Sequence, residues 1–219
     1  MPLSFNQLMP SGAHIWIWHL TETKEALEKF VQKEDFDEIL IRYKHPQRQL
    51  QKMAISLLTL QLGDGHIIDI QYDELGKPTP KDFPGFISIS HTTKYVGLLY
   101  HPLHPCGLDL EEISQRLLKV APRFINEIEK KWLDKSNPLN DIGLIWSVKE
   151  ALFKNIGGGG ILFKEQLEVN KPSFIDDVSG WGWATYKKDN LLRTFEYRFI
   201  NLEDVLLVHT IAIESERNI

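Results

Sequence analysis

Cysteine is almost absent from this chain of 219 residues, in which Cys106 is the single one. One cysteine cannot form an intrachain disulfide, so a disulfide-stabilised secreted fold is excluded, and we expect a cytoplasmic protein. No apolar run approaches the roughly 20 residues that a membrane-spanning helix needs. Residues 1–10 also lack the basic and apolar blocks of a signal peptide. We therefore expect no association with a membrane.

An excess of positive charge is also missing. The chain carries 25 Lys and Arg against 30 Asp and Glu, which gives a net charge of −5. Nucleic-acid-binding domains usually present a strongly basic face, so we expect no nucleic-acid partner. A local basic pocket for phosphate groups remains compatible with this balance. The 42% hydrophobic and 25% charged residues are typical of a globular protein of one large or two small domains.

Two acidic residues lie at the end of a predicted strand over residues 106–111, which follows another predicted strand over residues 95–100. Side chains two residues apart in a strand share a face, so Asp109 and Glu111 should point the same way. Adjacent carboxylates repel unless a cation lies between them or one is protonated. Oxygen ligands of this kind suit Mg²⁺. The alternative is that both acids simply end an edge strand in solvent.

A predicted helix over residues 146–154 carries a third carboxylate. Good helix formers fill its second half, and Gly157 provides a stop. Glu150 and Lys154 are four residues apart and therefore share a helix face. They form either an ordinary surface ion pair or a third metal ligand with a cation one turn further on.

Together these stretches resemble the two signature motifs of the 4′-phosphopantetheinyl transferases. Gly-Leu-Asp-Leu-Glu at 107–111 is followed, about forty residues later, by Trp-Ser-Val-Lys-Glu-Ala-Leu-Phe-Lys at 146–154. Gly-Lys-Pro at 76–78 and Ser-Ile-Ser-His at 88–91 resemble two further motifs of the family, in the same order along the chain. The length suggests the larger, monomeric, surfactin-synthetase-activating type.

The resemblance implies an α/β (α+β) fold of two similar halves related by a pseudo-twofold axis, each with a sheet packed on helices. The halves would be residues 1–102 and 103–219, with the active site between them. The sequence pattern predicts elements at similar positions. We expect strands at 13–20, 67–72, 86–91, 167–170, 181–186, 194–200 and 205–213, and helices from a Thr21 or Thr23 cap to about residue 30, at 35–43, at 47–62, and at 113–133 with a break at Pro122.

The activity implied by the resemblance is transfer of 4′-phosphopantetheine from coenzyme A to a serine of an acyl or peptidyl carrier protein. The transfer would require Mg²⁺ and release adenosine 3′,5′-bisphosphate, in fatty-acid, polyketide or nonribosomal peptide biosynthesis. Two alternatives remain open: a Mg²⁺-dependent phosphohydrolase, and a non-catalytic carrier-protein-binding module of the same fold. Sequence alone does not separate attack by serine from attack by water.

The resemblance also assigns roles to individual residues. Glu150 and Lys154 would be catalytic, and Glu129 is the candidate base, with Glu127 or a water as alternatives. The roles of Arg42 and Lys44, which precede Arg48, are left open because they do not align cleanly. The expected magnesium ligands are Asp109, Glu111 and Glu150, and the expected coenzyme A contacts are Arg48, Lys77, Ser90, His91 and Lys154.

A carrier-docking surface is predicted where apolar and basic residues alternate over residues 113–131. Carrier proteins are generally acidic, so this acidic chain needs a local basic patch to attract them. A zinc site at His101, His104 and Cys106, and a hydrolase built on Ser90 and His91, are weaker alternatives. The predicted apolar contacts are Leu117, Leu118 and Phe124, with Arg116, Lys119 or Arg123 supplying the charge.

Overall fold

The computed structural model describes residues 3–31, 33–63 and 65–218, and shows a mixed α+β fold with antiparallel sheets. The chain divides into two compact units, Met1–Leu103 and His104–Ile219, which we call the N-terminal and C-terminal units. No helix in the described part of the chain is both long enough and apolar enough to cross a membrane.

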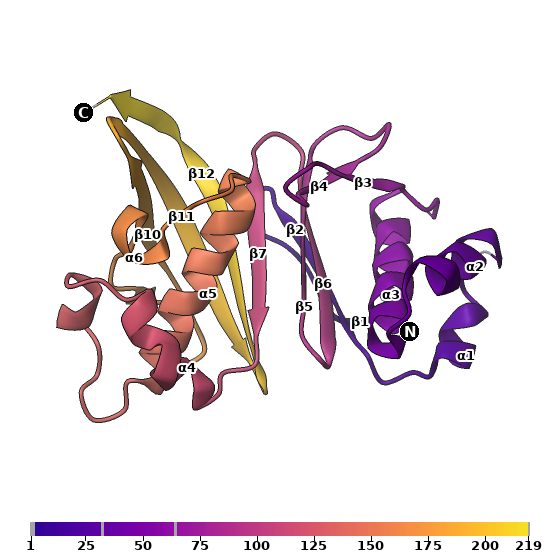
Figure 1. Cartoon of the computed structure of the whole chain (residues 1–219), viewed down its shortest axis with the longest axis horizontal. Helices are drawn as coiled ribbons and strands as arrows, with labels where there is room; N and C mark the ends of the chain where they lie inside the picture. Colours follow the sequence, from indigo (N-terminus) through magenta and orange to yellow (C-terminus); the bar gives the residue numbers. More distant parts are fainter. Residues whose placement is uncertain (1–2, 32, 64, 219) are drawn as a thin grey trace. The chain divides into compact units, whose positions relative to one another are not determined.

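The N-terminal unit is a four-stranded antiparallel sheet covered by helices (Figure 1). The sheet has the order β1 (Leu3–Leu8), β2 (His14–His19), β6 (Tyr95–His101), β5 (Phe86–His91). The other elements are α1 (Lys24–Glu28), α2 (Lys33–Arg42), α3 (Pro46–Leu62) and the hairpin of β3 (Ile70–Tyr72) and β4 (Pro78–Pro80).

Helix α3 is the main packing element of this unit. It begins at Pro46, whose fixed φ suits a first helical turn, and ends against the C-cap Gly63. Its buried side chains, which include Met53, Leu57 and Leu58, belong to one core with side chains of β2, β5 and β6. The sequence predicted these boundaries correctly because a proline and a glycine enclose a clear apolar face.

The C-terminal unit is built on a larger antiparallel sheet. Its strand order is β7 (Cys106–Glu111), β12 (Val205–Asn218), β11 (Leu191–Leu202), β10 (Ser179–Lys188), β8 (Leu167–Val169), and β9 (Ser173–Phe174) pairs with β10. Helix α5 (Leu139–Ile156) packs against this sheet, chiefly on β7 and β12 (Figure 1). The short helices are α4 (Arg116–Val120) and α6 (Phe163–Gln166).

Gly107 determines how closely α5 approaches β7. A Cβ atom at this position would lie 1.9 Å from the carbonyl oxygen of Ala151, which no side chain could tolerate. The helix then ends at Gly157, whose φ of 69° is the left-handed conformation that glycine adopts without strain. This close approach brings the acidic end of β7 against the face of α5 that carries Glu150 and Lys154.

Two predicted helices of the C-terminal unit had the wrong boundaries. Residues 113–133 form only the short α4 and two 3₁₀ turns, Ala121–Arg123 and Glu129–Lys131. The chain turns at Asn126, whose side-chain oxygen accepts hydrogen bonds from the backbone of Ile128 (3.0 Å) and Glu129 (2.9 Å). Helix α5 in turn begins at Leu139, before the start of the helix that was predicted over residues 146–154.

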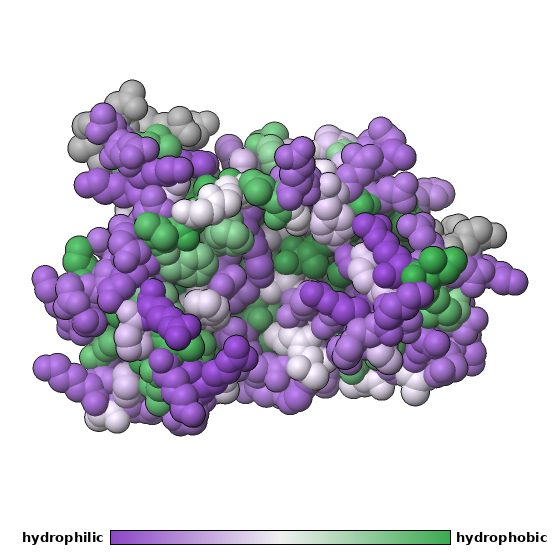
Figure 2. Space-filling view, in the orientation of Figure 1, coloured by the Kyte–Doolittle hydropathy of each residue, from purple (hydrophilic) through white to green (hydrophobic). Residues whose placement is uncertain are grey.

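The surface agrees with an ordinary globular composition. Figure 2 shows polar and charged residues over most of the face in view, with apolar residues in small groups between them. The larger exposed apolar side chains of the C-terminal unit include Leu118, Phe174 and Ile175.

Candidate active site

The two predicted acidic stretches meet in the C-terminal unit. Asp109 and Glu111 lie on β7, and Glu150 and Lys154 lie one turn apart on α5. The Lys154 ammonium lies 2.9 Å from Asp109 Oδ1 and donates a hydrogen bond to the carbonyl of Leu108 at 2.8 Å. We call Asp109, Glu111, Glu150 and Lys154 the carboxylate cluster. The prediction that these four side chains act together is consistent with this geometry.

The carboxylate cluster holds negative charge at an energetic cost. Burial, followed by the negative charge of Asp109, raises the pKa of Glu111 to about 7, although Trp146 Nε1 donates a hydrogen bond to its carboxylate at 3.1 Å. Burial and Asp109 likewise raise the pKa of Glu150 to about 7, against the favourable charge of Lys154. Both groups would be more stable as carboxylates beside an additional cation.

A metal site is not preassembled in the structure. Within residues 3–31, 33–63 and 65–218, no three His, Cys, Asp or Glu side chains are arranged to hold a metal ion, and this applies equally to the zinc alternative. The donor chemistry of the carboxylate cluster nevertheless fits Mg²⁺, which commonly binds one or two carboxylates together with substrate phosphates. The assignment of Asp109, Glu111 and Glu150 as ligands therefore stays a prediction.

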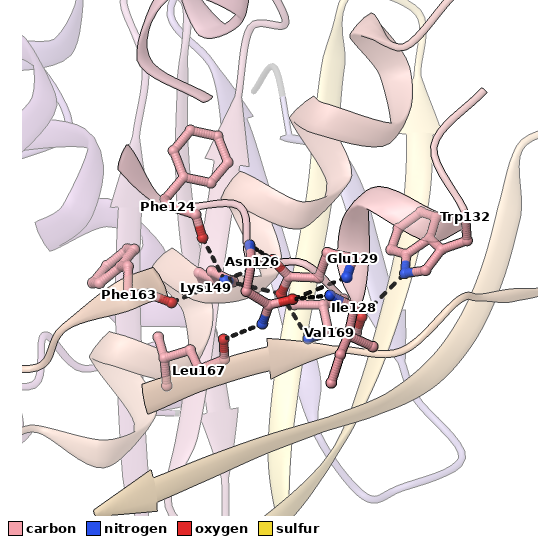
Figure 3. A network of polar contacts seen from close by, with 9 residues as sticks. All are labelled: Phe124, Asn126, Ile128, Glu129, Trp132, Lys149, Phe163, Leu167 and Val169. Carbon is pink, nitrogen blue, oxygen red and sulfur yellow. Dashed lines mark hydrogen bonds and ion pairs between the residues drawn. The ribbon is translucent and has the colours of Figure 1, made fainter. Parts of the chain in front are cut away.

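The structure does not bring Glu129 into the carboxylate cluster. Its side chain is fully buried and forms an ion pair with the equally buried Lys149 at 2.9 Å (Figure 3). Its two oxygens also accept hydrogen bonds from the backbone N–H groups of Asn126 and Val169, each at 2.9 Å. Both oxygens of Glu129 are thus hydrogen-bonded within the fold, and its role as the base stays a prediction.

The alternative base, Glu127, points outward instead. Its side chain is 79% exposed and pairs with Lys130 at 2.5 Å. The 3₁₀ turn that follows Asn126, in place of the expected helix, sends the two glutamates to opposite sides. Neither residue is therefore placed among the cluster by the structure.

Lys149 is a structural residue that the sequence analysis missed. Its ammonium donates to the carbonyls of Phe124 (2.6 Å) and Phe163 (2.8 Å) as well as to Glu129, so all three of its protons are used (Figure 3). A signal was available in the sequence. Lys149 continues the apolar stripe of Ile142 and Ile145 at spacings of seven and four residues, which marks the buried face of α5.

The N-terminal unit contains a basic pocket of about 410 Å³. Arg48 and His91 both line it, and Arg48 Nη1 hydrogen-bonds to His91 Nε2. Gly76 and Pro78, the neighbours of Lys77, also contribute to its wall, whereas Ser90 is buried beside His91 in β5. The remaining lining residues are Arg42, Tyr43, Lys52, Ile55, Tyr72 and Ile89.

Comparison with known proteins finds a family that resembles part of the chain. Residues 105–202 match the model of the 4′-phosphopantetheinyl transferase superfamily. This segment is therefore similar to that superfamily. The matched segment contains the whole carboxylate cluster and Lys149, but it does not include the basic pocket.

Two relatives of the superfamily are similar over parts of their length. The chain is 34% identical over 90 residues to the 4′-phosphopantetheinyl transferase gsp of Aneurinibacillus migulanus, covering 40% of this chain and 37% of that protein. It is 29% identical over 148 residues to the 4′-phosphopantetheinyl transferase Sfp of Bacillus subtilis (strain 168), covering 63% and 60%. The chain thus spans less than two thirds of each relative.

The predicted docking segment differs from expectation. Leu117 and Phe124 are buried in the core of the C-terminal unit, whereas Leu118 is 36% exposed. Their expected role as surface contacts was therefore wrong for two of the three apolar residues. A cavity of about 490 Å³ opens beside this segment, and its lining includes Glu111, Arg116, Arg123, Trp146 and Phe163.

Proposed function

We propose that the protein transfers 4′-phosphopantetheine from coenzyme A to a serine of an acyl or peptidyl carrier protein, and releases adenosine 3′,5′-bisphosphate. The observation that carries the proposal is the carboxylate cluster, in which Lys154 pairs with Asp109 and the charges of both act on Glu111 and Glu150. Such a cluster suits chemistry on a diphosphate, where a cation must neutralise charge on phosphate oxygens.

Each catalytic side chain then has a task. The serine oxygen forms a bond to the phosphorus that carries pantetheine, and the bond from this phosphorus to the oxygen of the adenosine 5′-phosphate breaks. Glu150 is assigned the role of accepting the serine proton. In the chain alone, burial and the charge of Asp109 raise its pKa to about 7. Lys154 stabilises the negative charge of the departing phosphate.

Asp109, Glu111 and Glu150 would hold Mg²⁺, which would neutralise the diphosphate. The chain itself supplies the orientation of these ligands. Trp146 fixes Glu111 through its indole N–H, and the close contact at Gly107 fixes β7 against α5. Glu150 thus has two proposed roles, as a metal ligand and as the base.

The basic pocket of the N-terminal unit is proposed as the site for the nucleotide part of coenzyme A. Arg48 donates to His91 Nε2 and has further N–H groups, which suit a phosphate monoester such as the 3′-phosphate. Lys77 and Ser90 are assigned to the same ligand, from the turn before β4 and from β5. We include three further properties in this proposal: the two halves are related by a pseudo-twofold axis, the protein is a monomer, and it is located in the cytoplasm.

The carrier protein is proposed to dock on α4 and the turn that follows it. Leu118 is the exposed apolar residue of this segment, and basic side chains surround it in the sequence. They would attract the acidic surface of a carrier protein. The basic residues are Arg116, Lys119 and Arg123.

Mass spectrometry of an apo carrier protein, incubated with this protein, coenzyme A and Mg²⁺, tests the proposal. A mass gain of one phosphopantetheine group is the expected result. Cleavage of coenzyme A without any gain on the carrier would indicate attack by water and a phosphohydrolase. An intact coenzyme A with stable carrier binding would indicate a non-catalytic module.

A further inference from the structure

One lysine of the basic pocket is held by aromatic rings rather than by an acid. Lys52 lies on α3, and its ammonium donates a hydrogen bond to the Tyr72 hydroxyl at 2.8 Å. The same nitrogen lies 4.6 Å from the ring centroid of Tyr72 and 5.3 Å from that of Tyr43. The two tyrosines thus hold the ammonium in place through cation–π contacts and one hydrogen bond.

This arrangement positions the charge of Lys52 without neutralising it. In the described part of the chain, Lys52 forms no ion pair with a carboxylate. An adjoining cavity of about 130 Å³ shares Lys52 and is also lined by Glu38 and Asp69, but neither acid pairs with the lysine. A lysine that served only the fold would gain more from an acidic partner than from two neutral rings.

The charges around Lys52 have the same sign. Arg42 and Arg48 line the same pocket, and among its described lining residues there is no Asp or Glu. The guanidinium group of Arg42 lies 5.7 Å from the Tyr43 ring, so a second cation shares this tyrosine. Three cations that gather in one concavity repel one another unless an anion binds between them.

The spacing of these cations suggests two separate positions at which an anion can bind in the pocket. Arg48, with His91, forms the first, and Lys52 lies one helical turn further along α3 at the i+4 position. Side chains at this spacing project to the same side, about 5–6 Å apart at Cβ. A ligand with two separated phosphate positions matches this pattern better than a single phosphate does.

We propose that Lys52, held between Tyr43 and Tyr72, binds a phosphate group of the bound nucleotide at a point separate from the Arg48 and His91 contact. The identity of the ligand as the nucleotide part of coenzyme A rests on the proposed function. Phosphate is the shared chemistry, and it can be either the 3′-phosphate or the diphosphate of coenzyme A. Lys52 is on this account a specificity-determining residue of the transfer reaction.

Calorimetric titration of the full chain with adenosine 3′,5′-bisphosphate, coenzyme A and dephospho-coenzyme A tests this inference. Lys52→Met keeps the length and packing of the stem and removes the charge. It should weaken binding of coenzyme A by about tenfold to a hundredfold, as expected for a lost charge-assisted hydrogen bond. Loss confined to ligands with a 3′-phosphate places Lys52 at that group, and equal loss with dephospho-coenzyme A places it at the diphosphate.

Two further variants test whether the effect of Lys52→Met comes from the position of its charge. One controls for the change in net charge, and the other removes the hydrogen bond that positions Lys52. Lys29→Met removes the same charge from an exposed position that lines neither cavity of this unit, and should leave the affinity unchanged. Tyr72→Phe keeps the ring but removes the hydrogen bond, and should weaken binding less than Lys52→Met does. Melting temperatures of all variants should stay near that of the wild type.

The outcomes distinguish this inference from the proposed function. A wild type that binds coenzyme A and modifies a carrier protein, together with an unchanged affinity in Lys52→Met, overturns the role of Lys52 alone. A wild type that binds none of the three nucleotides overturns both proposals. If Lys52→Met and Lys29→Met lose the same affinity for coenzyme A, the loss comes from net charge alone, and the assignment of Lys52 is overturned.

Discussion

Lys149 and Glu150 are neighbours on α5, yet their surroundings differ. Lys149 has all its hydrogen-bond partners within the fold, whereas Glu150 lies near other carboxylates. Lys149 is fully buried, and its three protons are donated to Glu129 and to the carbonyls of Phe124 and Phe163 (Figure 3). Glu150 lies in the carboxylate cluster, where burial and the charge of Asp109 raise its pKa to about 7. The same helix therefore carries Lys149, whose charge is paired within the fold, and Glu150, whose negative charge is destabilised by its surroundings.

The difference shows how burial alone misleads about function. The family resemblance assigned catalytic roles to both Glu129 and Glu150. Burial raises the pKa of both, but only Glu150 also feels the negative charges of Asp109 and Glu111, which an added cation would offset. Around Glu129, Lys149 and two backbone N–H groups offset part of the effect of burial on its pKa. Charge that is balanced internally indicates a structural role, and charge that is not balanced indicates a site.

The largest effect is expected from Glu150→Gln. The amide keeps the shape but cannot accept the serine proton, so kcat/KM for the carrier protein should fall about a hundredfold to ten-thousandfold. The fold should remain intact, because the substitution relieves repulsion with Asp109 and Glu111. Steady-state kinetics beside a thermal melt would measure both, and near-normal turnover would remove Glu150 from the mechanism.

Lys149→Met should have its effect on stability instead. Removing one partner of a buried ion pair leaves Glu129 charged and unneutralised, which typically costs about 3–5 kcal/mol. Chemical denaturation should show this loss in the free energy of unfolding. The matched surface control is Lys130→Met, whose partner Glu127 is exposed, and its loss should stay within about 1 kcal/mol. Similar losses in both variants would contradict the structural role of the buried pair.

The dependence of stability on pH gives a third, smaller effect. Glu111 and Glu150 have pKa values of about 7 in the folded protein, above the ordinary value of 4.5. The folded state therefore holds protons that the unfolded chain releases, and stability should fall as pH rises from about 4.5 to about 7. Above that range the loss should level off.

Magnesium should reverse this trend, because a metal binds the deprotonated carboxylates. Melting curves with EDTA and with Mg²⁺, at pH 5 and pH 8, measure the effect. The increase in melting temperature should be larger at pH 8, and Glu150→Gln should reduce it. An increase that is equal at both pH values would place magnesium binding elsewhere.

The smallest effect is expected from Leu118→Glu, on the proposed docking surface. An acidic charge at this exposed position should raise the KM for the carrier protein several-fold and leave coenzyme A affinity unchanged. Phe124→Glu is the contrasting variant, because Phe124 is buried in the core and should lose thermal stability. An unchanged KM in Leu118→Glu would exclude α4 from the interface.

Sequence predicted the parts of the fold that local signals define. Alternation indicated β7, a glycine marked the end of α5, and a proline and a glycine enclosed α3. The helix expected at 113–133 was shorter, because the side chain of Asn126 captures two backbone N–H groups and turns the chain. Its composition favours a helix, and only the turn chemistry reveals the interruption.

The carboxylate cluster was predictable as a set of residues but not as an electrostatic environment. Spacing predicted that Asp109 shares a strand face with Glu111 and that Glu150 shares a helix face with Lys154. The family resemblance joined these two pairs into one site. Whether a glutamate is neutralised depends on distant partners, and Glu129 finds its partner twenty residues away along the chain, in Lys149. The hydrogen bond from Lys52 to Tyr72 likewise joins α3 to β3, two elements whose contact the sequence did not predict.

The most direct test of this contrast is a mass measurement on an apo carrier protein with coenzyme A and Mg²⁺, using Glu129→Gln and Glu150→Gln in parallel. The measurement should be made at a temperature where circular dichroism shows both variants folded. We predict that folded Glu129→Gln still adds a phosphopantetheine group to the carrier, whereas Glu150→Gln adds almost none. The reverse result, an inactive folded Glu129→Gln and an active Glu150→Gln, would contradict the assignment of a structural and a reactive charge to α5.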